Sequence, residues 1–240
     1  MSAKKRLGPK SPVFIFTERK AKETPEEYWT RIIKENLEKK APPVLMAEIL
    51  GRIIGNKEQR EGVDELTGLK TKGLFWRDLE ESLGLVQRFS RGDFTGKISL
   101  ILFDLDDFKR ENDLHGYLWG DEILKKVARI LKNKRRTSDI VVRWGGEEFC
   151  LILIGCPVRM ATKIAEKLRQ SIEKIGITAS FGVAESKAAQ EKSKDFFKRA
   201  NVACAIAKGR IEHPSVKGLP KNRVVRWQSD MPKSLERKHD

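Results

Sequence analysis

The stretch R-W-G-G-E-E-F-C-L-I-L, residues 143 to 153, combines a polar turn with an apolar strand. Apolar runs lie on both sides of the turn, I-V-V before it and F-C-L-I-L-I after it. Two such runs joined by Gly145 and Gly146 predict a buried β-hairpin with strands at 139 to 144 and 147 to 154. A turn requires the glycines but not the two glutamates that follow them, so these carboxylates indicate a further function.

Regular apolar patterns continue on both sides of this hairpin. They predict helices at 73 to 90, 107 to 114, 120 to 132, 161 to 175 and 194 to 208, and strands at 97 to 103, 177 to 184 and 223 to 227. The central order is strand, helix, hairpin, helix, strand, which is the split βαβ arrangement of ferredoxin-like folds. The expected class is α+β of the palm type, with a mostly antiparallel sheet flanked by helices.

The two ends of the chain show different patterns from this centre. V-F-I-F at 13 to 16 predicts a short strand, and helices are expected from 24 to 40 and from 44 to 60. The chain is thus divided into a mobile basic N-terminus (1 to 23), a helical hairpin for dimerisation or regulation (24 to 62), a catalytic domain (63 to 227) and a polar tail (228 to 240).

The composition limits the classes of partner and location. The net charge of +15, from 49 basic and 34 acidic residues, favours an anionic partner or an ion-pair-rich surface. The basic residues are scattered, so no nucleic acid is expected. No apolar run approaches the roughly 20 residues that span a bilayer, and no signal peptide is evident, so a cytoplasmic location is expected. The three cysteines are expected to be buried free thiols, and neither they nor the histidines show metal-ligand spacing.

Two acidic segments are expected to meet at one end of the sheet. Asp104 ends an apolar strand, where packing alone would not select a charge, and Glu147 lies at the hairpin tip. In a split βαβ fold these strands are neighbours. Two close carboxylates repel unless a cation lies between them, and hard oxygen ligands favour Mg²⁺ or Mn²⁺. Solvated acids at a simple turn remain the alternative.

Glycines and cations beside these acids suit a nucleotide phosphate. Gly145 and Gly146 let the backbone approach closely, and Lys109, Arg110 and Arg143 can supply positive charge, although each is equally a surface cation.

Asn112 and Asp121 bracket a glycine-rich turn and carry the chemistry to read a base. A carboxylate can accept from N1–H and N2–H₂ of guanine, a donor pair that adenine lacks. The alternative is that Asp121 caps the helix after Gly120.

Together these segments resemble the GGDEF domain of diguanylate cyclases, in its GGEEF form. The matching segments are D-E-L-T-G-L at 64 to 69, F-D-L-D-D-F-K at 103 to 109, N-D-x-x-G at 112 to 116, G-D at 120 to 121, R-W-G-G-E-E-F at 143 to 149 and I-T-A-S-F-G-V-A at 177 to 184. The resemblance implies that a homodimer condenses two GTP into cyclic di-GMP and releases two pyrophosphates. It also implies metal binding by Asp104, the Leu105 carbonyl and Glu147, deprotonation of the 3′-hydroxyl by Glu147, and support from Glu148.

The resemblance assigns further binding residues. Asn112 and Asp121 would read guanine. Phosphate contacts are implied for Phe108, Lys109, Arg143, Gly145, Gly146, Lys208 and Arg210. Arg136 and Asp139 form an R-x-x-D motif five residues before the G-G-E-E-F, as in the family's inhibitory product site, and Lys167 is grouped with them.

The sequence departs from the family pattern after residue 200. The usual A-D-E-x-x-Y-x-A-K reads A-N-V-A-C-A-I-A-K at 200 to 208, and an insertion at 211 to 220 leaves open which of Arg210, Lys221 or Arg223 binds phosphate. The alternative function is therefore a catalytically silent GGDEF domain that acts as a receptor for GTP or cyclic di-GMP. A relative that makes other oligonucleotides is disfavoured by Asn112, Asp121 and the R-x-x-D.

Overall fold

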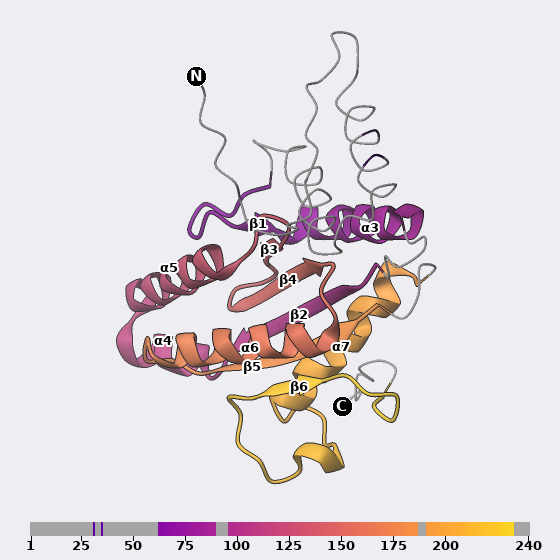
Figure 1. Cartoon of the computed structure of the whole chain (residues 1–240). Helices are drawn as coiled ribbons and strands as arrows, with labels where there is room; N and C mark the ends of the chain where they lie inside the picture. The colour runs from indigo at the N-terminus through magenta and orange to yellow at the C-terminus, as the bar shows by residue number, and fades with distance from the viewer. Residues whose placement is uncertain (1–30, 32–34, 36–61, 90–95, 187–190, 233–240) are drawn as a thin grey trace, which may run out of the picture.

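A computed structural model describes residues 31, 35, 62–89, 96–186 and 191–232 (Figure 1). Arg31 and Glu35 are helical, and an ion pair of 3.2 Å joins their side chains. The strand expected at 13 to 16, and the rest of the helices expected before residue 62, lie outside the described residues.

A six-stranded sheet forms the centre of the fold, in the order β1-β3-β4-β2-β5-β6 (Figure 1). The strands are β1 (Lys70–Thr71), β2 (Ile98–Leu105), β3 (Ile140–Arg143), β4 (Glu148–Ile154), β5 (Ala179–Glu185) and β6 (Val224–Arg226). The four central strands pair antiparallel, and the two outer ones pair parallel to their neighbours. The predicted split βαβ sheet is therefore confirmed. Strand β1 was not predicted, because a strand of two residues is too short to show an apolar pattern.

Helices cover both faces of this sheet. They are α3 (Lys72–Phe89), α4 (Phe108–His115), α5 (Tyr117–Lys134), α6 (Val158–Glu173) and α7 (Ser193–Ala207), followed by a 3₁₀ turn at Pro214–Val216. Alternate residues of a strand point to opposite faces. Leu100 and Leu102 therefore pack toward α3 and α7, while Ile101, Phe103 and Leu105 pack toward α5 and α6.

Strand β2 is buried along its whole length, which fixes the position of its acidic end. Phe103 lies between Phe149 and Phe181, with ring centroids 5.1 and 4.5 Å away. These three rings tie β2 to both of its neighbours one residue before Asp104. The packing thus holds Asp104 at a defined height in the sheet.

Packing continues beyond the expected domain end at residue 227. Met231 is buried in a third apolar cluster with Val202, Ile206 and Val225. Met231, which falls within the expected polar tail, thus packs on the domain. Within the described residues, no helix is long and apolar enough to cross a membrane.

Gly182→Ala is expected to destabilise the fold by about 3 kcal/mol. A Cβ at this position would lie 2.2 Å from the Cys204 nitrogen and 2.3 Å from the Ala200 carbonyl oxygen. These are backbone atoms of α7 and cannot turn aside. Gly84→Ala is the control, because a Cβ there meets nothing within 4 Å and alanine favours a helix. Urea denaturation of both variants measures the difference, and equal stability of the two would contradict the close approach of α7 to β5.

Candidate active site

Asp104 lies at the carboxyl end of β2 and is only 3% exposed. It is in register with Glu148 on β4 and with Ser180 on β5. The following residue, Leu105, donates its N–H to the Glu147 carbonyl oxygen at 3.2 Å. The structure therefore places the hairpin tip beside the end of β2.

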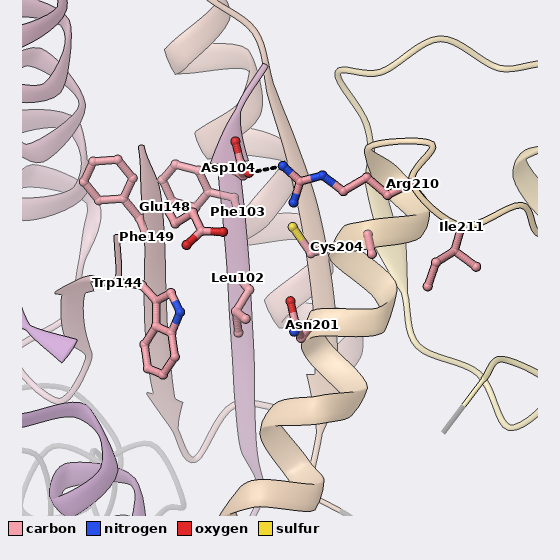
Figure 2. A pocket seen from close by; sticks show the side chains of 11 residues that line it. Leu102, Phe103, Asp104, Trp144, Glu148, Phe149, Asn201, Cys204, Arg210 and Ile211 are labelled. Carbon is pink, nitrogen blue, oxygen red and sulfur yellow. Dashed lines mark hydrogen bonds and ion pairs between the residues drawn. The ribbon is translucent and has the colours of Figure 1, made fainter. Parts of the chain in front are cut away.

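The two glutamates of the tip lie in different surroundings. Glu148 is half-buried in a cavity that Asp104 also lines (Figure 2). Burial raises the pKa of the Glu148 carboxyl, and the nearby charge of Asp104 raises it further. Glu147 instead lines a separate depression together with Leu105 and Lys208. Asp104 thus meets Glu148 directly, which sequence reasoning missed because it did not assign the strand register.

Two cations already contact the Asp104 carboxylate. The Lys208 ammonium forms a buried ion pair with Oδ1 and lies 3.5 Å from the Leu105 carbonyl oxygen. The Arg210 guanidinium lies 3.2 Å from Oδ2 (Figure 2). The Lys208 ammonium therefore contacts two of the three expected metal ligands, and we call this pair of oxygens the cation site.

The ligand set available to a metal is small. No cluster of three or more His, Cys, Asp or Glu side chains suited to a metal occurs in the described part of the chain. Mg²⁺ or Mn²⁺ would therefore be bound by Asp104, the Leu105 carbonyl oxygen and Glu147, with Glu148 nearby. Water or phosphate oxygens would complete the coordination shell.

An open depression next to this cation site suits a polyphosphate. Five basic and three acidic side chains line it, together with Leu105 and Phe108: Lys109, Arg110, Lys208, Arg210 and Lys221, and Asp107, Asp113 and Glu147. Lys221 contacts Asp107 at 2.7 Å, and this hydrogen bond lowers the pKa of that carboxyl. The insertion at 211 to 220 is therefore followed by a lysine, Lys221, that lines the depression.

Arg223 does not belong to this group of cations. Its guanidinium donates to the carbonyl oxygens of Val216 and Leu219 and holds the inserted loop. Of the three candidates left open by the sequence, Arg210 and Lys221 line the depression, and Arg223 does not.

Arg143, which was expected to bind phosphate, is engaged by other parts of the protein. Its guanidinium donates to both carboxylate oxygens of Asp64, at 2.9 and 3.0 Å, and to the Gly146 carbonyl oxygen at 2.8 Å. The Gly145 N–H likewise donates to the Glu148 carbonyl oxygen at 3.2 Å. Arg143 and the Gly145 N–H therefore both support the hairpin tip in this structure.

A further acid, Asp106, was not predicted as a site residue but supports the end of β2. Asp106 is buried and accepts from Thr178 (3.0 Å), Ser180 (2.8 Å) and the Asn222 N–H (3.1 Å). Burial raises the pKa of its carboxyl. Asp106 thus joins the end of β2 to the segment that carries Lys221. Its position in the acidic motif D-L-D-D, residues 104 to 107, is the sequence feature that could have identified it.

The predicted guanine readers lie close together at the junction of α4 and α5. A Cβ at Gly120 would lie 2.0 Å from Asn112 Oδ1, so the Asn112 amide packs on Gly120, next to Asp121. Asn112 Oδ1 is buried and has no hydrogen-bond partner among the residues that the structure describes. Helix α5 begins at Tyr117, so Asp121 lies in its second turn, and the capping alternative is wrong.

The R-x-x-D segment forms the turn between α5 and β3. Asp139 is buried and accepts the Arg136 N–H at 2.8 Å, while the Asp139 N–H donates to the Arg136 carbonyl oxygen at 3.1 Å. Burial raises the pKa of the Asp139 carboxyl. Lys167 is exposed on α6. Asp139 therefore shapes this turn, and the half-buried Arg136 side chain is the part most open to a ligand.

Comparison with known proteins identifies the family. Residues 61–212 match the family described as "Diguanylate cyclase, GGDEF domain". The chain belongs to the GGDEF family.

Relatives of this GGDEF chain include proteins named as diguanylate cyclases. Diguanylate cyclase A of Treponema denticola is 32% identical over 180 residues, which are 71% of this chain and 46% of that protein. Diguanylate cyclase DgcM of Escherichia coli K12 is 38% identical over 151 residues, which are 60% of this chain and 35% of that protein. The chain therefore spans less than half the length of these relatives.

Solved structures agree with the GGDEF fold. The GGDEF domain of DgcB from Caulobacter crescentus, in complex with c-di-GMP, has a TM-score of 0.61 at 25% identity and covers 70% of this chain and 97% of that one. The active GGEEF domain of a diguanylate cyclase from Vibrio cholerae has a TM-score of 0.56 at 25% identity and covers 66% and 97%.

Proposed function

We propose that this GGDEF protein is a diguanylate cyclase that condenses two GTP into cyclic di-GMP in the cytoplasm. One observation carries the proposal. A buried carboxylate, Asp104, lies at the end of a fully buried strand and pairs with Lys208 and Arg210, two of the five basic side chains that line the adjacent depression. This arrangement suits metal-assisted phosphoryl transfer.

The residues around the depression divide the chemistry. The 3′-oxygen of one GTP attacks the α-phosphorus of the other, and the bond to the bridging oxygen of pyrophosphate breaks. Glu147 takes the proton from the 3′-hydroxyl. Bound Mg²⁺ or Mn²⁺ supplies charge neutralisation at the transferred phosphate. Two such transfers, one in each direction, close the ring and release two pyrophosphates.

Substrate binding follows from the same geometry. Lys109, Lys208, Arg210 and Lys221 contact the phosphates, together with the backbone at Phe108 and Gly146. Lys208 exchanges its contact with Asp104 for the triphosphate when the cation site is filled. Asn112 and Asp121 select guanine, because a carboxylate matches the two N–H donors of its edge. Since each subunit holds one GTP, two subunits must face each other.

Incubation of the purified chain with GTP, with ATP and with both, in the presence of Mg²⁺, tests this function. Mass spectrometry should identify cyclic di-GMP from GTP alone, and the rate per subunit should rise with protein concentration as dimers form. GTP binding without product would instead support the silent receptor. A mixed or linear product would support another nucleotide polymerisation.

Arg136→Ala should weaken inhibition by cyclic di-GMP about tenfold or more, because guanidinium stacking and bridging would be lost. The product concentration that halves the initial rate is the measurement. Lys134→Ala, an exposed change at the end of α5 two residues before Arg136, is the control. Equal inhibition of both variants and the native chain would show that the R-x-x-D motif is not an inhibitory site for cyclic di-GMP.

A further inference from the structure

A cavity of about 220 Å³ lies between the hairpin and α7, and it is lined differently from the phosphate depression (Figure 2). Leu102 on β2 contributes to its floor, and Trp144 and Glu148 form one wall. Asn201 on α7 lines the opposite wall, and the Arg210 side chain extends toward Asp104. Ala205, also on α7, belongs to the lining as well. Since a cavity of about 150 Å³ holds a benzene ring, this one has room for a two-ring heterocycle.

The cavity exists because α7 carries small residues where it faces the hairpin. Asn201, Cys204 and Ala205 occupy positions i, i+3 and i+4, so they share one face of the helix. Asn201 and Ala205 are also two of the positions where the chain departs from the usual family helix, with alanine in place of tyrosine. A cavity of this size with polar groups in its lining offers hydrogen-bonding partners to a ligand.

The polar groups around the cavity can recognise a neutral heterocycle. Glu148 offers a half-buried carboxylate, and the Asn201 amide offers both a donor and an acceptor. Figure 2 shows the nitrogen-bearing edge of the Trp144 indole turned toward the cavity. Lys72 over the ring, at 4.6 Å, and Phe197, with its centroid at 4.5 Å, hold that indole in place. The carboxylates of Glu148 and Asp104 disfavour a phosphate inside the cavity itself.

We propose that this cavity is a second guanine site, distinct from the pair Asn112 and Asp121. The Glu148 carboxylate accepts from N1–H and N2–H₂, and the indole N–H of Trp144 and the Asn201 amide donate to O6 and N7. Arg210 stacks on the open face of the base, and Leu102 contacts the other face. Any phosphate attached to the base extends outward past Arg210, which is 60% exposed.

Occupation of this cavity has a consequence for the phosphate depression. A base under Arg210 keeps the guanidinium on Asp104 and engages Glu148, so both are withheld from a second nucleotide. The consequence depends on the proposed function, whereas binding itself does not. The two can therefore fail separately: a chain without cyclase activity can still bind guanosine here.

Guanosine, which lacks phosphates, is the probe, and equilibrium dialysis is the measurement. Asp121→Ala first removes a reader of the other guanine site. One guanosine per subunit should still bind in this background and adenosine at least about tenfold more weakly. Adding Ala205→Tyr, which fills the cavity, should weaken guanosine binding at least about tenfold, whereas adding Ala205→Ser should leave it within about twofold. Absence of guanosine binding in the Asp121→Ala chain, or equal binding to all three proteins, would overturn the proposal.

A second measurement serves if Ala205→Tyr prevents folding. The chain has five tryptophans, and Trp144→Phe identifies the indole ¹⁵N–H signal of Trp144. Guanosine should shift that signal in the Asp121→Ala protein, and adenosine should not. An unmoved Trp144 signal at saturating guanosine would overturn the site. Parallel titrations with GTP and cyclic di-GMP show which guanine compound binds most tightly.

Discussion

Glu147→Gln should lower the rate of cyclic di-GMP formation by about 10³-fold or more, with little change in stability. The side chain lines the phosphate depression beside Leu105 and Lys208, where the attacking 3′-hydroxyl must lose its proton. Glutamine keeps the shape but cannot accept a proton, and general base catalysis contributes about 10² to 10⁴-fold. Loss of a metal ligand adds to this effect.

The measurement is the initial rate of pyrophosphate release at saturating GTP, with Mn²⁺ binding followed separately by electron paramagnetic resonance. Glu122→Gln, an exposed change on α5, is the control and should retain the native rate. Glu148→Gln separates the two neighbouring glutamates. Glu148 lies beside Asp104 and lines the cavity between the hairpin and α7. Glu148→Gln should therefore lower the rate less than Glu147→Gln does. A Glu147→Gln rate within tenfold of native would remove Glu147 as the base.

The sheet and its acidic end followed from local patterns. Strand β2 is a continuous apolar run, and the hairpin is two such runs around two glycines, so their existence was readable without homologues. The split βαβ order then placed the hairpin next to β2. Only the register was missing, and a one-residue difference in register decides which glutamate shares a face with Asp104.

Contacts between distant segments were not readable in the same way. Arg143 was expected to bind phosphate, but its partner Asp64 lies 79 residues earlier in the chain. Lys221 lies at the depression next to Asn222, whose N–H donates to Asp106, a residue 116 positions earlier in the chain. Such pairings depend on the completed tertiary structure and leave no periodic signal in the sequence. The start of α5 was likewise missed because Gly116 turns the chain with a φ of 86°, which the glycine alone does not reveal.

Lys208→Met should bind Mn²⁺ about tenfold more tightly than the native chain in the absence of nucleotide, and should turn over GTP about 10²-fold more slowly. In the structure the Lys208 ammonium contacts Asp104 Oδ1 and the Leu105 carbonyl oxygen, which are two of the expected metal ligands. A metal must therefore displace it. Methionine has a similar length without the charge, so the competition disappears, but so does a phosphate contact.

Electron paramagnetic resonance titration of Mn²⁺ measures the affinity, and pyrophosphate release measures turnover. Lys208→Arg keeps the charge and should keep the weaker metal affinity, whereas Lys198→Met, exposed on the preceding helix α7, should change neither quantity. Unchanged or weaker Mn²⁺ binding in Lys208→Met would show that the lysine does not compete for these oxygens. The opposite signs of the two expected effects exclude simple unfolding, because a destabilised site would lose metal affinity and turnover together.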